Sequence, residues 1–198
     1  MNLAHSYTLI APFYDALLAA ASRGQRTRSL AGLPREPARI LLNGVGTGLD
    51  LPLLPATRHR YTGIDLTHAM LRRAMLRTGD LDVQWVQGDS QRLPFADGSF
   101  DHAVLHLILA VLPDPLAGLR ETARVLAPGG TVLIFDKFLR PGQRAPVRRL
   151  LNPLLRRVAT RLDVVLEDLL AQTPLLQLEG DNPALAGGWF RLVRLRRA

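Results

Sequence analysis

The chain has 198 residues, of which 47% are hydrophobic, and carries a formal net charge of +8 at pH 7. A chain of this length buries roughly 70% of the surface that its unfolded form exposes, so we expect a single domain over residues 1–198. The absence of cysteine excludes disulfides and thiolate metal sites, and no apolar run reaches the roughly 20 residues of a membrane-spanning helix. The five histidines show no ligand spacing, so we expect no metal site, and no positive-then-apolar leader opens the chain, which predicts a cytoplasmic location.

The first predicted element is a helix over residues 10–30. Leu17, Leu18 and Ala21 form an apolar stripe at helical spacing within it. We expect residues 1–30 to form a helical cap on the domain.

A strand that ends in a glycine turn is predicted over residues 39–48. Gly44, Gly46 and Gly48 follow the apolar run at every second position, so the turn can adopt backbone angles that other residues avoid and can bring main-chain N–H groups against a ligand. A dinucleotide fingerprint requires glycine at the first, third and sixth positions, whereas Leu49 occupies the sixth. No lysine followed by serine or threonine marks a phosphate-binding P-loop. A tight turn without a ligand remains the alternative.

Acidic residues follow the next two predicted strands. The strand 60–65 ends in Asp65, and an apolar helical stripe then begins that includes Met70. An acid at the tip of the second strand of a βαβ unit can accept both hydroxyls of a ribose, and a turn or helix-start aspartate is the alternative. The third strand, 83–86, leads to Asp89 in the same way.

The second half of the chain continues the alternation. An apolar strand is predicted over 103–107, a helix starts at Asp114 and Pro115 and ends before residues 128–130, and a strand covers 131–136. Two more strands, 175–178 and 190–195, flank a predicted loop at 180–183. Alternating strands and helices favour an α/β fold, a doubly wound and mostly parallel sheet covered on both faces. Ligands bind such sheets at the carboxyl ends of the strands.

The order of these motifs resembles the class I S-adenosylmethionine-dependent methyltransferases, and in particular the group of ubiquinone/menaquinone C-methyltransferases and bacterial phospholipid N-methyltransferases. The likeness extends from about Tyr14 to Asp136 and rests on five ordered motifs. It implies a Rossmann-like sheet of seven strands with the last strand antiparallel, S-adenosyl-L-methionine as cofactor, and direct in-line transfer of a methyl group to a small-molecule or lipid-like acceptor. The cofactor contacts that it implies are Tyr14, Asn43, Gly44, Gly46, Gly48, Asp65, Leu66, Met70, Asp89, Ser90, His106 and Leu107.

The resemblance also gives these residues roles. The three glycines would line the methionine part of the cofactor, Asp65 would hold the ribose, Leu66 and Met70 would flank the adenine, and Asp89 with Ser90 would meet its edge. His106 and Leu107 would border the methionine and the transferred methyl, and Tyr14 would close over the cofactor. The family usually carries an acid just before the first glycine, whereas this chain has Asn43.

A basic segment follows the fifth strand. Arginines alternate with bulky aliphatic residues between Arg140 and Arg161, within a predicted helical segment 138–172 on the substrate side. One interpretation is a helix with a solvated basic face, and the other is a surface that contacts anionic membrane, beside a lipid-like or quinone-like substrate. Nucleic acid is disfavoured because no aromatic stacking series accompanies the arginines.

The sequence does not identify the catalytic residues. A sulfonium methyl is already activated, so the protein has chiefly to hold the nucleophile in line and exclude water. His106 is a candidate base, and Asp136 and Lys137 are equally placed to touch a substrate. Two other functions remain: a catalytically silent module that binds S-adenosylmethionine or S-adenosylhomocysteine, and an NAD-binding oxidoreductase, which the glycine spacing disfavours.

Overall fold

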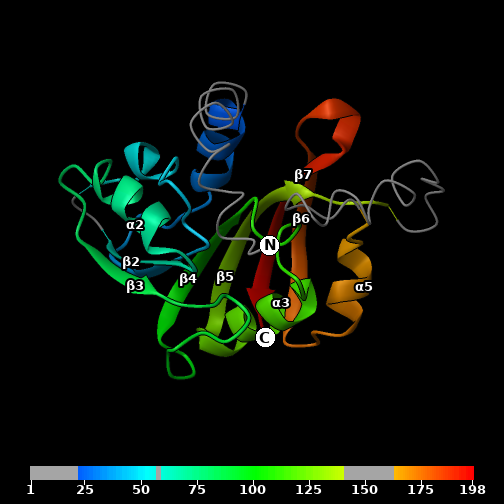
Figure 1. The fold of residues 1–198 in the computed structure, drawn as a ribbon. Helices are drawn as coiled ribbons and strands as arrows, with labels where there is room; N and C mark the ends of the chain where they lie inside the picture. The colour runs from blue at the N-terminus through cyan, green and yellow to red at the C-terminus, as the bar shows by residue number, and fades with distance from the viewer. Residues whose placement is uncertain (1–21, 57–58, 141–162) are drawn as a thin grey trace.

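The structure is a computed structural model that describes residues 22–56, 59–140 and 163–198. A seven-stranded sheet in the order β3-β2-β1-β4-β5-β7-β6 crosses the molecule (Figure 1). The strands are β1 (Arg39–Asn43), β2 (Arg60–Asp65), β3 (Val83–Gln87), β4 (Phe100–His106), β5 (Leu126–Lys137), β6 (Leu176–Pro183) and β7 (Phe190–Arg197). The first five strands pair in parallel, and β7 runs antiparallel to both of its neighbours. The predicted doubly wound sheet with an antiparallel last strand is confirmed.

Helices cover both faces of the sheet because strand side chains alternate in direction. Ile40 and Leu42 of β1 pack in one core cluster, which includes Leu30 of the helical residues 22–30 and Ala74 of α2 (His68–Met75). The intervening Leu41 belongs to a second cluster, which α3 (Pro115–Val125) and α5 (Leu166–Ala171) complete on the opposite face. Short 3-10 turns lie at Leu51–Leu53 (η1) and Ala186–Gly188 (η2).

The helix starts follow from their capping residues. Thr67 caps α2 by accepting a hydrogen bond from the backbone N–H of Met70. Asp114 caps α3, where its carboxylate accepts from the N–H groups of Leu116 and Ala117, and Pro115 occupies the first turn. Residues 22–30 confirm the end of the predicted N-terminal helix, while residues 10–21 lie outside the described residues.

Two predicted boundaries are wrong. The residues 180–183, predicted as a loop, belong to β6, where a register shift between Leu178 and Gly180 keeps the strand paired with β7. Arg191 of β7 binds the carboxylate of Asp181 across this pair, and an edge strand tolerates a proline. Likewise β5 begins at Leu126, directly after α3, so that residues 128–130 lie within a strand whose register is irregular opposite Phe100.

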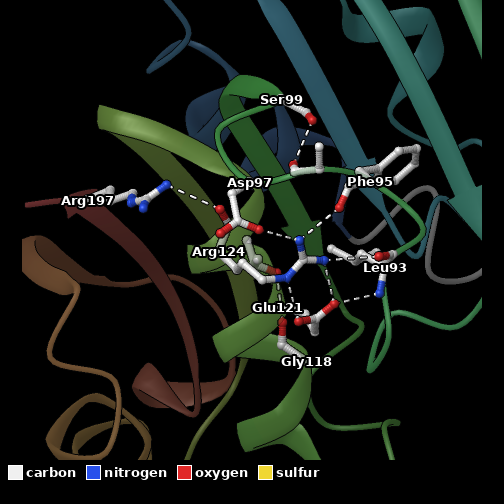
Figure 2. Close-up of polar contacts among 10 residues, drawn as sticks. Leu93, Phe95, Asp97, Ser99, Gly118, Glu121, Arg124 and Arg197 are labelled. Atoms are coloured by element: carbon white, nitrogen blue, oxygen red, sulfur yellow. Dashed lines mark hydrogen bonds and ion pairs between the residues drawn. The ribbon is translucent and has the colours of Figure 1, made fainter.

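Arg124 near the end of α3 holds the connection between β3 and β4 (Figure 2). Its guanidinium contacts Glu121 at 2.8 Å and Asp97 at 2.7 Å, and it donates to the backbone oxygens of Leu93 and Phe95. Glu121 in turn accepts from the N–H of Leu93. The hydrogen bond between the two side chains lowers the pKa of Glu121 and raises the pKa of Arg124. This cluster fixes the path of the chain back to the start of β4.

The predicted helical segment 138–172 is described only in part. Residues 166–171 form α5, and Leu139 and Val165 form an isolated bridge that brings the two ends of the segment together. Residues 141–162, which include most of the arginines of the basic segment, lie outside the described residues.

Candidate active site

The predicted site residues gather at the carboxyl edge of the parallel strands. The glycine turn follows β1, Asp65 ends β2, Asp89 follows β3, and His106 ends β4. Because parallel strands end at the same edge of a sheet, four segments that are distant in sequence meet there. Residues 22–30 and the turn between β6 and β7 rise on this side of the sheet in Figure 1.

The three glycines of the turn have different roles. Gly44, Gly46 and Gly48 have φ angles of 70°, 57° and 79°, in the left-handed region that favours glycine. A Cβ at Gly44 would lie 2.5 Å from the side chain of Ile108, and a Cβ at Gly48 would lie 2.9 Å from the Cα of Ala74. A Cβ at Gly46 would meet no atom within 4 Å. Gly44 and Gly48 therefore allow close packing, whereas Gly46 faces open space in which a ligand can approach the backbone.

Asp65 connects the glycine turn to α2. One carboxylate oxygen accepts from the N–H of Gly46 at 2.9 Å, and the other accepts from the N–H of Thr67 at 3.0 Å. Burial raises the pKa of this carboxyl, while the hydrogen bonds from Thr67 and Gly46 oppose the rise. The next residue, Leu66, is 62% exposed, which is unusual for a large apolar side chain, and Met70 is half-buried one turn further along. An acid and an exposed apolar side chain thus stand side by side at the end of β2.

Asp89 and Ser90 begin the loop after β3. The carboxylate of Asp89 accepts from the backbone N–H of Gln91 at 2.8 Å and from its side-chain amide, and Ser90 is buried. The amide oxygen of Gln91 then accepts from the N–H of Asp114 at 2.8 Å. These bonds hold the start of this loop against the start of α3, on the same edge as Asp65.

His106 lies in a buried polar cluster. Its Nδ1 is 2.8 Å from Asp50 Oδ1, and its Nε2 is 2.9 Å from Ser29 Oγ. Arg26 contacts the same oxygen of Asp50 at 2.8 Å. Burial by itself raises the pKa of Asp50, but the charges and hydrogen bonds of His106 and Arg26 outweigh burial and hold that pKa well below its usual range. Asp50 is therefore ionised, and since a carboxylate only accepts, Nδ1 of His106 carries the proton.

Sequence reasoning missed Asp50, Arg26 and Ser29. One signal was present: Ser22, Arg26 and Ser29 repeat at four and three residues, which places a polar stripe along the helix, and Arg26 also donates to Ser22. Nothing in the spacing of Asp50 or His106 indicates that these residues face that stripe, because the contact depends on how the helix packs on the sheet.

Leu107 and Asn43 show two further features of this edge. Leu107 has a φ of 61°, which a leucine seldom adopts, and its N–H donates to the oxygen of Phe135. Strained backbone of this kind often occurs at functional sites. Asn43 is buried and its amide donates to Thr122 of α3 at 3.1 Å, so this side chain points to the α3 face of the sheet.

Asp136 and Lys137 end β5. Asp136 has no exposed surface, and its carboxyl oxygens accept from the N–H groups of Lys137 at 2.8 Å and Ala110 at 3.2 Å. Burial raises the pKa of Asp136 to about 6, against the effect of these hydrogen bonds, and burial also lowers the pKa of Lys137. Tyr14 lies outside the described residues.

Within residues 22–56, 59–140 and 163–198, no group of three or more His, Cys, Asp and Glu side chains is arranged to hold a metal ion. None of the helices in that part of the chain is long and apolar enough to cross a membrane.

Several known proteins are similar to this chain. A family model described as a methyltransferase domain matches residues 41–134. The phosphatidylethanolamine N-methyltransferase of Cereibacter sphaeroides is 34% identical over 189 residues, which cover 93% of this chain and 92% of that protein. The demethylmenaquinone methyltransferase of Mycobacterium sp. strain KMS is 34% identical over 149 residues, and the match covers 73% of this chain but 63% of that protein.

Solved structures share the fold at lower identity. A SAM-dependent methyltransferase from Thermotoga maritima, described as a possible histamine N-methyltransferase, has a TM-score of 0.74 and 19% identity, with all of both chains covered. An S-adenosylmethionine-dependent methyltransferase from Mesorhizobium loti has a TM-score of 0.69 and 21% identity over 91% of this chain and all of that one. On the match to the Cereibacter sphaeroides relative and on the family model, the chain belongs to the S-adenosylmethionine-dependent methyltransferases.

Proposed function

We propose that this protein transfers a methyl group from S-adenosylmethionine to the amine of a phosphatidylethanolamine-type lipid. The observation that carries the proposal is the 34% identity to a phosphatidylethanolamine N-methyltransferase across nearly the whole of both chains. The demethylmenaquinone relative matches a smaller part of this chain and of its own length, so a quinone-like acceptor is the second candidate.

The residues at the carboxyl edge fit the proposed cofactor. Gly46 has open space where a Cβ would stand, the carboxylate of Asp65 can accept from ribose hydroxyls, and the exposed side chain of Leu66 offers an apolar surface to a purine. We assign the remaining cofactor contacts to the residues that the family resemblance implies. We also propose that the cap 1–30 and the segment 138–172 complete a single domain. Asn43 differs from the other implied contacts, because its side-chain amide donates to Thr122 of α3.

The bound cofactor supplies an activated methyl electrophile, so the protein has chiefly to position the amine and to exclude water. An ammonium group must lose its proton before it can attack. In the described part of the chain, both ring nitrogens of His106 have partners and the carboxyl of Asp136 is completely buried. Neither group is free to take that proton directly, and we assign no catalytic base.

Methyl transfer is tested with methyl-labelled S-adenosylmethionine and two kinds of vesicle, one containing phosphatidylethanolamine and one containing a reduced demethylmenaquinone. Label in the phospholipid supports the proposal, and label only in the quinone replaces it with the second candidate. Binding of S-adenosylhomocysteine without transfer to either would refute both acceptors and favour a silent cofactor-binding module.

Two glycine variants test the assignment of the cofactor site. Gly46 and Gly79 both have a positive φ and open space where a Cβ would stand, so alanine costs a similar strain of about 1 kcal/mol at either position. Only Gly46 lies at the carboxyl edge. We expect Gly46→Ala to weaken S-adenosylhomocysteine binding by about tenfold or more, and Gly79→Ala to leave it unchanged. Equal affinity of the two variants would show that the cofactor does not lie against Gly46.

We also propose that the basic segment from Arg140 to Arg161 brings the protein to an anionic membrane that holds the lipid substrate. The support is the alternation of arginine with aliphatic residues in the sequence. Co-sedimentation with anionic but not with neutral vesicles, weakening as salt rises, is the expected result. Changing Arg148, Arg149, Arg156 and Arg157 together to Gln should reduce it, and equal, negligible sedimentation with both lipids at low salt would refute it.

A further inference from the structure

A buried ion pair joins three segments beside the glycine turn. Arg26 comes from the helical residues 22–30, Asp50 follows the glycine turn, and His106 ends β4. These three residues and Ser29 are each between 5% and 8% exposed. The helix is attached at two points, from Arg26 to Asp50 and from Ser29 to His106. The cluster therefore links the helix to the glycine turn after β1 and to the end of β4.

Stability alone is a poor reason for this arrangement. Removing charges from water is costly, and apolar residues of similar volume often stabilise a buried position as well as an ion pair does. An ion pair adds directional contacts that fix the orientation of the groups it joins, because Asp50 Oδ1 accepts from Arg26 and from His106 at 2.8 Å each. A cluster of leucines would hold the helix without fixing its orientation.

Asp50 is closely coupled to the glycine turn. The N–H of Gly48 donates to the oxygen of Val45, and the N–H of Leu51 donates to the oxygen of Gly48. The side chain of Leu51 would be only 2.6 Å from a Cβ at Gly48, so the residue that follows Asp50 packs tightly on the turn. At its other contact, His106 directly precedes the strained Leu107. A movement of Asp50 would therefore be transmitted to Gly48 and to the end of β4.

We propose that Asp50 is a positioning residue for cofactor binding: through Arg26 and His106 it holds helix 22–30, the glycine turn and the end of β4 in their relative places. This inference rests on the proposed function, since it requires that the glycine turn binds S-adenosylmethionine. Asp50 acts through its neighbours and does not itself contact the cofactor.

The test measures S-adenosylhomocysteine binding by isothermal titration calorimetry in folded variants of the full chain. Asp50→Asn removes the charge that Arg26 and His106 share, and we expect it to weaken binding by about tenfold or more. Ser29→Ala keeps the ion pair and removes only the contact to His106 Nε2, so a loss of about threefold to fivefold is expected. The control is Asp101→Asn, which removes the charge from a more exposed Arg–Asp pair of 2.7 Å between Arg39 and Asp101 at the opposite edge of the sheet.

Thermal unfolding without ligand separates positioning from a purely structural role. A structural role predicts that Asp50→Asn lowers the melting temperature but that the folded variant binds S-adenosylhomocysteine as the wild type does, and this result would overturn the inference. Arg26→Lys, which keeps the charge, should retain more affinity than Arg26→Met. If Asp50→Asn does not fold, Ser29→Ala decides, and an affinity equal to that of Asp101→Asn refutes the proposal. Absence of binding by the wild type would instead refute the proposed function.

Discussion

Asp50 and Asp136 are two buried carboxyl groups at the same edge of the sheet, and their pKa values move in opposite directions. Asp50 lies beside the glycine turn, between β1 and β4, whereas Asp136 ends β5 in the half of the sheet that leads to β7. The pKa of Asp50 is held well below its usual range, while that of Asp136 is raised to about 6. Both carboxyls are desolvated, so burial does not explain the difference.

The hydrogen-bonding and charged partners of the two carboxyls explain the opposite pKa shifts. Asp50 shares one oxygen between the guanidinium of Arg26 and an imidazole N–H of His106, so a nearby cation and two hydrogen bonds stabilise the ionised form. Asp136 receives backbone N–H groups, and these do not offset its desolvation. The comparison shows that the edge beside the glycine turn contains a fixed charge, whereas the end of β5 contains a carboxyl whose charge depends on pH.

Stability at neutral pH should separate the two carboxyls most strongly. Asp50→Asn leaves Arg26 as a buried cation without its partner, which typically costs about 3–5 kcal/mol. Asp136→Asn removes a poorly solvated charge and keeps one acceptor oxygen, so a much smaller change is expected at pH 7. Urea unfolding of both variants measures the difference, and equal destabilisation would contradict the view that charged partners distinguish the two sites.

The pH dependence of stability should also have opposite signs. The pKa of Asp136 rises on folding from 3.8 to about 6, so its contribution to stability is fully present below about pH 4 and is lost as pH rises from there through 6. That loss is about 3 kcal/mol for a shift of about two units. The pKa of Asp50 falls on folding, so its contribution is present above about pH 4 and is lost only as the solution becomes more acidic.

The measurement compares wild type with Asp136→Asn at several pH values. Between pH 4 and pH 7.5 the variant should gain about 2–3 kcal/mol of unfolding free energy relative to the wild type, because asparagine cannot ionise. A difference that does not change with pH would mean that the carboxyl of Asp136 titrates normally in the folded protein.

Much of the fold could be predicted because the local signals agree with the tertiary structure. The strand that ends at Asp65 and the helix start at Asp114 are placed correctly, since apolar runs and capping residues act over a few positions. The error at residues 180–183 has the opposite cause. Glycine, aspartate, asparagine and proline indicate a turn locally, but Arg191 pairs with Asp181 across β6 and β7 and keeps the strand extended.

The meeting of candidate site residues at one edge of the sheet could also be predicted, while their roles in binding stay predictions. Gly46, Asp65 and His106 reach one edge because each follows a strand of a parallel sheet, which is a consequence of topology. The hydrogen-bond partners of these side chains could not be predicted, because no local pattern shows that His106 faces Asp50 or that Asn43 faces Thr122. Such contacts are decided by helix packing over long separations in the chain.

Asp65 extends the comparison to a carboxyl proposed to bind ligand directly. Like Asp136 it receives backbone N–H groups, and burial raises its pKa, but Asp65 remains partly exposed at the edge. If the ionised group accepts two ribose hydroxyls, Asp65→Ala should cost about 2–3 kcal/mol of S-adenosylhomocysteine affinity, or roughly 30- to 150-fold. Titration calorimetry measures the loss, with Asp101→Ala as a control away from the site. An unchanged dissociation constant would assign Asp65 to the turn alone.

Asp114 tests the contribution of hydrogen bonds to a carboxylate without burial, and its replacement should have the smallest effect on stability. Its carboxylate receives two backbone N–H groups, each at 3.0 Å, and Asp136 also receives two, but Asp114 is exposed at the start of α3. Water can solvate the charge, so the two bonds act without a large desolvation cost and Asp114→Ala should remove about 1 kcal/mol of unfolding free energy. Asp114→Asn keeps an acceptor for the same N–H groups and should restore most of that loss. If urea unfolding shows Asp114→Ala to be as costly as Asp50→Asn, backbone donors alone would account for the stabilisation by a carboxylate, and the importance given to Arg26 and His106 would be wrong.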